Sequence, residues 1–208
     1  MKRLVLATAC LAFGLTLPAM AANPLVELDT TAGKIRIELM PDAAPKTVAN
    51  FLEYVKAGYY EGTQFHRVID GFMIQAGGFD ADFKSKPTRP PVANEAEAAS
   101  KAGLLNAPGT IAMARTSNPH SATAQFYINV NDNKSLNFRS PDPSGVGYTP
   151  FGKVVAGMDV VGRIAKSPKG GSKPVPSGTP LDPRDVPSTP VIINKAMVVD
   201  ASAPAVSK

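Results

Sequence analysis

The sequence contains no tryptophan, one cysteine and two histidines among its 208 residues. The cysteine, Cys10, lies near the N-terminus, so the rest of the chain has no disulfide. His66 and His120 are too few for a zinc site, which usually needs three or four closely spaced ligands. The chain also lacks a Gly-Lys-Ser/Thr phosphate loop, and Gly145 and Gly147 lack a third glycine at the spacing of a dinucleotide site. We therefore expect no metal and no cofactor.

Charge gives little indication of a partner. The formal net charge is +5, but the sequence has no run of five basic residues, and its basic and acidic residues are interspersed. We expect no nucleic-acid partner. Hydrophobic residues make up 44% of the chain, which is enough for one compact domain of ordinary size.

Residues 1–21 have the layout of a secretory signal peptide. Lys2 and Arg3 precede an apolar run at 4–17, and a small-residue pattern follows at 19–21. The run is too short to span a bilayer comfortably, and no other apolar stretch approaches about 20 residues. We expect export to the periplasm without stable membrane insertion.

Cleavage of this segment is expected after Ala21 or Ala22. Lipoprotein processing at Cys10 is an alternative. It is disfavoured because Ala7 stands where a bulky aliphatic residue is usual and because the apolar run continues past the cysteine.

Apolar periodicity predicts the first elements. Apolar and polar residues alternate over 25–39 around a turn at 31–33, which is typical of a β-hairpin with one buried face. A helix is predicted from Pro45, with Gly58 as its stop. Its apolar residues are spaced by three and four: Val48, Phe51, Leu52 and Val55.

Further strands are predicted at 63–69, 110–114, 125–130 and 191–199, and a second helix at 158–166. Many strands and two helices imply a mainly β fold, in which an antiparallel sheet closes or curls and the helices cover its open ends.

We assign residues 22–201 to one domain and 202–208 to a flexible tail. The proline- and glycine-rich stretch 167–184 has no apolar period and is predicted to be a long loop. It is either an insertion without a role or a contact surface for a partner.

Two segments carry candidate site residues. In the first, Arg67 lies close in sequence to Phe72 and Met73, across a turn at Asp70-Gly71. In the second, alternation places Gln125 and Tyr127 on the face opposite the residues expected in the core. A lone arginine is usually a surface partner of a carboxylate, but together these side chains indicate an apolar pocket rimmed by a cation and an amide.

These segments resemble the cyclophilin family in its bacterial form. The similar stretches are Phe65–Gly78, Gly109–Arg115, Gln125–Val130 and Phe151–Val154, and the similarity covers roughly residues 26–199. The resemblance implies a closed eight-stranded antiparallel β-barrel capped by two α-helices. It also implies peptidyl-prolyl cis/trans isomerase activity without a metal or cofactor.

The resemblance implies roles for matching positions. Arg67 matches the essential arginine, and His66 beside it is expected to be structural. The proline pocket is implied to consist of Phe72, Met73, Tyr127 and Leu136. Positions that contact the substrate backbone or flanking residues are matched by Gln75, Ala114, Arg115, Gln125 and Tyr148.

The sequence departs from the family at three positions. Members that bind cyclosporin tightly have a tryptophan where Ser135 stands, so we expect weak cyclosporin binding. Tyr127 replaces a more usual phenylalanine, and its hydroxyl needs a partner if it is buried. Tyr148 stands where many members have histidine.

We therefore expect a monomeric isomerase that accelerates X-Pro rotation in the folding of exported proteins. Its partners would be unfolded or partly folded proline-containing polypeptides. The main alternative is a periplasmic peptide-binding chaperone with little catalysis on the same fold. A hydrolase built from a histidine, a serine and a distant acid is a remote third.

Overall fold

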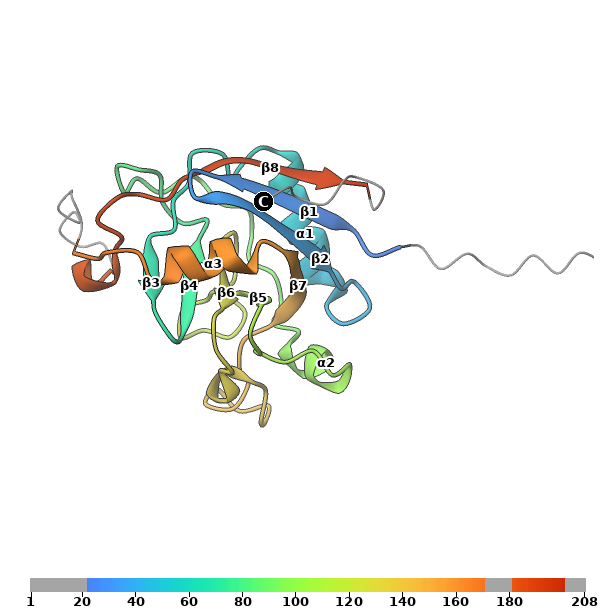
Figure 1. Ribbon diagram of the computed structural model, residues 1–208. Helices are drawn as coiled ribbons and strands as arrows, with labels where there is room; N and C mark the ends of the chain where they lie inside the picture. Colours follow the sequence, from blue (N-terminus) through green and yellow to red (C-terminus); the bar gives the residue numbers. More distant parts are fainter. Residues whose placement is uncertain (1–21, 171–180, 201–208) are drawn as a thin grey trace, which may run out of the picture.

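An eight-stranded antiparallel sheet dominates the computed structural model, which describes residues 22–170 and 181–200 (Figure 1). Its strands are β1 (Leu25–Thr30), β2 (Gly33–Leu39), β3 (Arg67–Ile69), β4 (Met73–Ala76), β5 (Thr110–Met113), β6 (Phe126–Asn129), β7 (Pro150–Ala156) and β8 (Ile193–Val199). They follow the order β3-β4-β6-β5-β7-β2-β1-β8 in the sheet. The predicted signal peptide (1–21), the centre of the predicted loop (171–180) and the end of the chain (201–208) lie outside the described residues.

The predicted N-terminal hairpin is confirmed. β1 and β2 pair in a register that sets Leu28 opposite Ile35 and Val26 opposite Ile37, and all four side chains are fully buried. The turn ends at Gly33, whose φ of 126° lies in the region that glycine adopts without a steric penalty. The alternation in the sequence therefore sets both the register and the buried face.

The closed barrel expected from the resemblance is wrong, because the sheet is curled but open. β3 and β8 form its two edges and do not pair with each other as strands. Three backbone hydrogen bonds bridge the gap, from the N–H groups of Gly62, Phe65 and Ile193 to the carbonyls of Ile193, Val191 and Thr63. The chain just before each edge strand is irregular, so these bonds tie the edges together without forming a ladder.

Within the described residues, three α-helices accompany the sheet, where two were expected. α1 (Pro45–Lys56) packs against β8, and α3 (Met158–Ala165) packs against β2 and β4, close to their predicted positions. The additional helix is α2 (Ala96–Lys101), which is too short to produce a readable apolar period.

The first turn of α1 is capped from a distant segment. Ala44, at its N-cap, offers no side-chain hydrogen bond. Instead the Glu95 carboxylate accepts hydrogen bonds from the backbone N–H groups of Lys46 and Thr47 at 3.1 and 2.8 Å. A negative group at this end also suits the helix dipole, so Glu95 fixes α1 beside α2.

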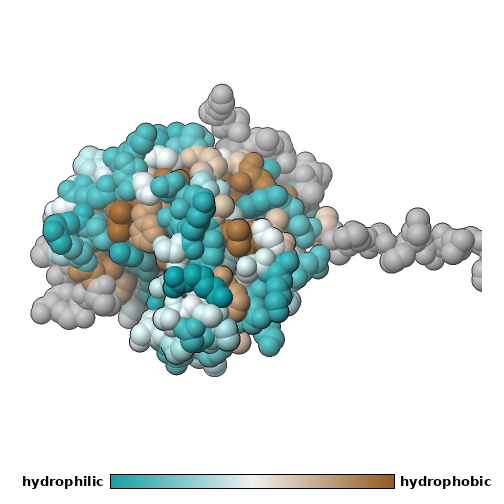
Figure 2. All heavy atoms as spheres, turned by 90° about the horizontal axis from the view of Figure 1, so that it is seen from below, coloured by the Kyte–Doolittle hydropathy of each residue, from teal (hydrophilic) through white to brown (hydrophobic). Residues whose placement is uncertain are grey.

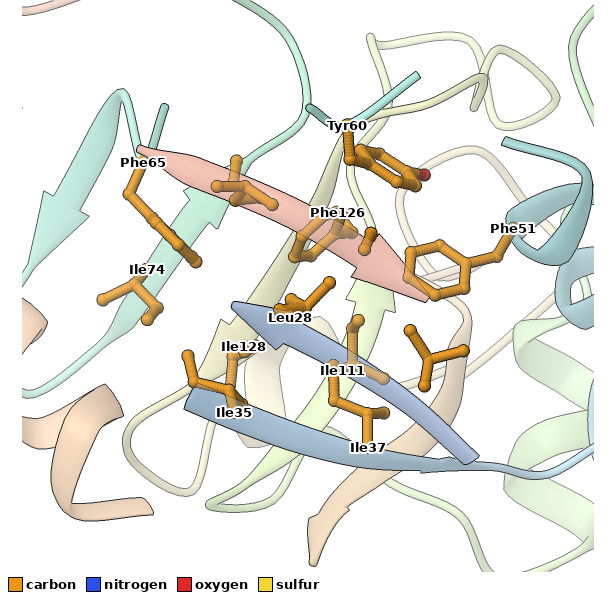
Figure 3. Packing of buried hydrophobic residues seen from close by; sticks show 14 of the residues in the cluster. Leu28, Ile35, Ile37, Phe51, Tyr60, Phe65, Ile74, Ile111, Phe126 and Ile128 are labelled. Carbon is orange, nitrogen blue, oxygen red and sulfur yellow. The ribbon is translucent and has the colours of Figure 1, made fainter. Parts of the chain in front are cut away.

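The main core combines aliphatic side chains with a group of aromatic rings (Figure 3). The Phe51 ring lies 5.6 Å from Phe126 in an edge-to-face arrangement and 5.1 Å from Phe151, and Tyr60 packs edge-on against Phe126 at 5.4 Å. Such pairs add to the free energy gained from burying apolar area. This core makes β4, β5 and β6 a rigid support for the side chains on their opposite face.

The surface seen in Figure 2 is largely hydrophilic, with apolar residues in several small separate areas. Among the helices of the described residues, none has the length and apolar character that crossing a bilayer requires.

Candidate active site

Strand register gathers the candidate residues on one face of the sheet. Arg67 in β3 is directly opposite Gln75 in β4, and Gln75 is opposite Tyr127 in β6. Tyr127 is in turn opposite Ala112 in β5. Because directly paired residues project to the same side, these four side chains form a row across four strands.

An apolar pocket lies along this row. Met73, two residues before Gln75 on the same strand, forms a buried cluster with Ala112 and Tyr127, separate from the main core. The pocket has a volume of about 130 Å³. Its lining residues are Arg67, Phe72, Met73, Gln75, Ala114, Arg115, Tyr127, Leu136 and Tyr148. The structure thus brings nine of the ten predicted site residues around one cavity.

The size and lining of the pocket suit a small ring. A cavity of ~150 Å³ lined by apolar side chains accommodates benzene, so one of about 130 Å³ has room for a five-membered ring. Its polar groups come from the arginine and glutamine side chains at its edge. This combination is typical of a site that holds an apolar group and directs a few hydrogen bonds at its polar end.

Gln125, the tenth predicted residue, lies beside the pocket and not in its wall. Its Oε1 accepts a hydrogen bond from Nε2 of Gln75 at 2.8 Å. Gly78 leaves room for it, because a Cβ at that position would lie 2.6 Å from Cδ of Gln125. Gln125 lines a larger adjoining hollow of about 700 Å³. Both hollows are lined by Arg67, Gln75, Ala114 and Arg115.

The two arginines have different surroundings. Arg115 donates from Nε and Nη2 to the Gly147 carbonyl and from Nη1 to the Thr116 carbonyl, and it lies 4.4 Å over the Tyr148 ring. Arg67 donates from Nε to Oδ2 of Asp185 at 3.2 Å. Within residues 22–170 and 181–200, Nη1 and Nη2 of Arg67 have no hydrogen-bond acceptor. Arg115 is therefore fixed in the wall, whereas Arg67 presents two donor nitrogens at the pocket edge.

His66 is fully buried next to Arg67 and lines the larger hollow. Burial lowers its pKa to about 4, opposed by hydrogen bonding to the Gln64 backbone and to the Gln125 side chain and helped by the charge of Arg67. Its ring packs edge-on against Phe79 with a centroid distance of 4.9 Å. A neutral, packed imidazole agrees with the expectation of a structural role.

Two residues at the site were missed from the sequence. Asp185 contacts Arg67 from a segment 118 positions away, and Asn106 accepts a hydrogen bond from the Tyr127 hydroxyl at 2.7 Å. Neither belongs to a motif, and neither has a local pattern that predicts it.

Ser135, one of the positions at which the sequence departs from the family pattern, is exposed and lies in a short 3₁₀ turn, Lys134–Leu136.

The described residues contain no group of three or more His, Cys, Asp or Glu side chains placed to hold a metal ion. The site therefore combines an apolar pocket, the two terminal donor nitrogens of the Arg67 guanidinium, and the amide side chains and backbone groups around them.

Comparison with known proteins bears directly on this arrangement. Residues 25–198 match the family model described as cyclophilin type peptidyl-prolyl cis-trans isomerase/CLD. The chain is 51% identical to peptidyl-prolyl cis-trans isomerase cyp18 of Streptomyces antibioticus, covering 84% of this chain and 98% of that protein. It is 49% identical to peptidyl-prolyl cis-trans isomerase B of Escherichia coli (84% and 99% covered) and 44% identical to peptidyl-prolyl cis-trans isomerase A of Dickeya dadantii (96% and 99%).

Solved structures agree in fold. A cyclophilin-type isomerase from Cryptosporidium parvum aligns with a TM-score of 0.65 at 24% identity, over 86% of this chain and 98% of its own. Cyclophilin AquaCyp293 from Hirschia baltica aligns with a TM-score of 0.62 at 25% identity, over 86% and 75%.

Proposed function

Because this chain belongs to the cyclophilin-type peptidyl-prolyl cis-trans isomerases, we propose that Arg67 and the apolar pocket beside it form its active site. Enzymes of this family act on proline-containing peptides, and membership favours catalysis over the alternative of a peptide-binding chaperone with little activity. The observation that carries the proposal is the open pair of nitrogens on Arg67 at the edge of a pocket with room for a proline ring.

The reaction breaks no covalent bond. Resonance in the X-Pro amide gives a rotation barrier of about 18–20 kcal/mol, and uncatalysed exchange takes tens to hundreds of seconds. In the twisted state this resonance is lost and the proline nitrogen regains a lone pair. An enzyme therefore needs only to bind the twisted state more tightly than either planar state.

Arg67 supplies an interaction that strengthens as the bond twists. An N–H of its guanidinium donates to the lone pair that develops on the proline nitrogen as amide resonance is lost. One charge-assisted hydrogen bond contributes about 1.5–3 kcal/mol, whereas a 10⁵-fold acceleration requires about 7 kcal/mol. The hydrogen bond from Arg67 alone therefore cannot account for an acceleration of that size.

The remaining stabilisation comes from holding the two sides of the bond separately. Phe72, Met73, Tyr127 and Leu136 enclose the ring, while other residues in the pocket wall and beside the pocket hold the substrate backbone. That second group comprises Gln75, Ala114, Arg115, Gln125 and Tyr148. A fixed ring and an oriented backbone reduce the rotational freedom that has to be lost on the way to the transition state.

A proline-isomerisation assay on purified variants tests this role. Arg67→Ala is expected to lower kcat/KM by about ten- to a hundredfold, which corresponds to the loss of one charge-assisted hydrogen bond. Arg67→Lys is expected to be less impaired, because lysine keeps the charge but loses the planar fork. The matched control is Arg163→Ala, which removes an exposed arginine paired with Asp159 in α3, away from the pocket. Wild-type activity in a folded Arg67→Ala protein would exclude the proposed site.

For its place of action, we propose the periplasm, with exported proteins as clients. The support is the charged, apolar and small-residue pattern of the N-terminal segment. A monomer is sufficient for this function, since all the proposed site residues come from one chain.

A further inference from the structure

A carboxylate from the far end of the chain contacts the proposed catalytic arginine. Oδ2 of Asp185 accepts the hydrogen bond from Nε of Arg67 at 3.2 Å, across a sequence separation of 118 residues. Both side chains are partly exposed, at 38% for Arg67 and 24% for Asp185. Asp185 ends a 3₁₀ turn, Pro183–Asp185, directly after the proline-rich stretch predicted as a long loop.

The segment that carries Asp185 is anchored on both sides. Within the turn, the Asp185 N–H donates to the Asp182 carbonyl at 2.9 Å. Beyond it, Val186 is buried, and its carbonyl accepts a hydrogen bond from the Gly170 N–H at 3.0 Å. The Ser188 N–H donates to the Pro168 carbonyl at 2.7 Å. The two ends of the predicted loop are therefore tied together, and they hold Asp185 at a fixed place beside β3.

The ion pair contributes little to stability. Partly exposed pairs are typically worth about 0–1 kcal/mol, because water screens the charges and ordering the side chains costs entropy. The larger effect of the ion pair is on the orientation of the Arg67 side chain. A free arginine side chain samples many rotamers, and an acceptor at Nε removes much of that freedom while leaving Nη1 and Nη2 available. These are the two nitrogens that have no acceptor among the described residues.

We propose that Asp185 is a positioning residue for catalysis: its carboxylate holds Nε of Arg67 so that the terminal nitrogens of the guanidinium face the proline pocket. The proposal rests on the assignment of Arg67 as the catalytic arginine. It gives a role in the active site to the residue that directly follows the 167–184 stretch. The same segment lines the larger hollow through Leu181, Asp182 and Asp185.

The proposal is tested with Asp185→Ala and Asp185→Asn in a proline-isomerisation assay that separates kcat from KM. Asp185→Ala is expected to lower kcat by about tenfold with KM changed less than about twofold, because small misplacements of a catalytic group reduce the rate by up to about a hundredfold. Asp185→Asn keeps an oxygen of the same geometry and is expected to recover most of the lost kcat. Asp159→Ala is the matched control, since it breaks a carboxylate–arginine pair in α3, outside both hollows.

Two further measurements distinguish orientation from general structural damage. The ¹H–¹⁵N signal of the Arg67 Nε–H group is expected to shift and to exchange faster with water in Asp185→Ala, while the melting temperature stays close to that of wild type. The double variant Arg67→Ala/Asp185→Ala is expected to be no slower than Arg67→Ala alone, because Asp185 acts only through the arginine.

The experiments distinguish a failure of the active-site assignment from a failure of the role proposed for Asp185. If Arg67→Ala keeps wild-type turnover, the active-site assignment fails, and this proposal fails with it. If Arg67→Ala is impaired but Asp185→Ala turns over at the wild-type rate, only the role of Asp185 is overturned. A faster Asp185→Ala enzyme would overturn it as well, since the carboxylate would then restrain the arginine.

Discussion

The hydroxyl of Tyr127 donates a hydrogen bond to Oδ1 of Asn106 at 2.7 Å, and both side chains are buried. Nδ2 of the same asparagine donates to the carbonyls of Leu136 and Tyr148 at 3.2 and 3.3 Å. One buried amide therefore connects three of the residues that line the pocket. It also provides the partner that the tyrosine hydroxyl was expected to need.

Asn106→Ala is predicted to damage both stability and the pocket. The substitution leaves the Tyr127 hydroxyl and the Tyr148 carbonyl without this partner, whereas the Leu136 carbonyl still accepts from the Tyr148 N–H at 2.9 Å. Unsatisfied buried polar groups cost about 1–3 kcal/mol each. We expect the free energy of unfolding to fall by at least about 2 kcal/mol and KM to rise, because Leu136 and Tyr148 lose their shared anchor. Denaturant unfolding and steady-state kinetics measure the two effects.

Tyr127→Phe is a smaller change in the same hydrogen-bond network. It removes the hydroxyl but keeps the ring, and Oδ1 of Asn106 retains Nδ2 of Asn129 at 3.3 Å. The loss of one hydrogen bond should cost about 1 kcal/mol of stability, with turnover close to wild type. Equal stability of Asn106→Ala and wild type would show that the network does not hold the pocket together.

Stability is predicted to fall in mild acid because of His66. Burial lowers its pKa to about 4 in the folded protein, below the ordinary value of 6.5. A group with a depressed folded pKa binds its proton more readily when the chain unfolds. The contribution of His66 is therefore fully present above pH 6.5 and is lost as the pH falls toward 4. The shift corresponds to about 3 kcal/mol.

Denaturant unfolding between pH 4 and 7 measures this loss. A His66→Gln variant is expected to be less sensitive to pH over that range, since the substituted residue does not titrate. Because the imidazole is neutral above pH 6, kcat/KM should show no titration of His66 between pH 6 and 8. A step near pH 6.5 that disappears in His66→Gln would contradict the structural role assigned to this residue.

Elements with a clear apolar period were predictable from the sequence, and others were not. The hairpin at 25–39 and the helices α1 and α3 follow directly from spacings of two, three and four. β7 was not predicted as a strand, and it carries Gly152, a residue that is rare in strand interiors. Gly152 is required there, since a Cβ would lie 2.5 Å from the Glu38 carbonyl oxygen.

The residues of the site also divide into those that the sequence indicated and those that it did not. The motifs that resemble the family contain residues that the fold brings around one cavity, because strand register turns a sequence pattern into a row of side chains. Asp185 and Asn106 form hydrogen bonds with residues 118 and 21 positions away. Such pairs depend on how the loops fold back onto the sheet, and no local spacing reveals them. The gap between the edge strands β3 and β8 likewise depends on the irregular chain before each strand.

Cyclosporin is predicted to inhibit this enzyme only weakly. Ser135, next to Leu136 at the pocket, stands where tightly binding members of the family have tryptophan, and it offers little apolar area to a bulky ligand. Its exposed position leaves room for a larger side chain. Ser135→Trp should therefore lower the inhibition constant by about tenfold or more, since burying a large apolar side chain contributes about 1.5–3 kcal/mol. Tight inhibition of the wild-type enzyme would contradict the prediction.

Export is predicted to precede folding. Cleavage after Ala21 or Ala22 leaves two or three residues before β1, which lies between β2 and β8 in the sheet. These residues are already engaged in the folded domain: Nδ2 of Asn23 donates to Glu38 at 2.9 Å, and the Pro24 carbonyl accepts from the Leu39 N–H at 2.8 Å. A peptidase that needs an extended chain has little access to this site once β1 is in place.

Mass spectrometry of the protein from fractionated cells tests this order. The mature chain is expected in the periplasmic fraction, with its N-terminus at Ala22 or Asn23. A variant lacking residues 2–21 should stay in the cytoplasm but retain full isomerase activity in vitro, because the sheet begins at Leu25. Full-length wild-type protein in the cytoplasm, or a lipid-modified chain beginning at Cys10, would contradict the prediction.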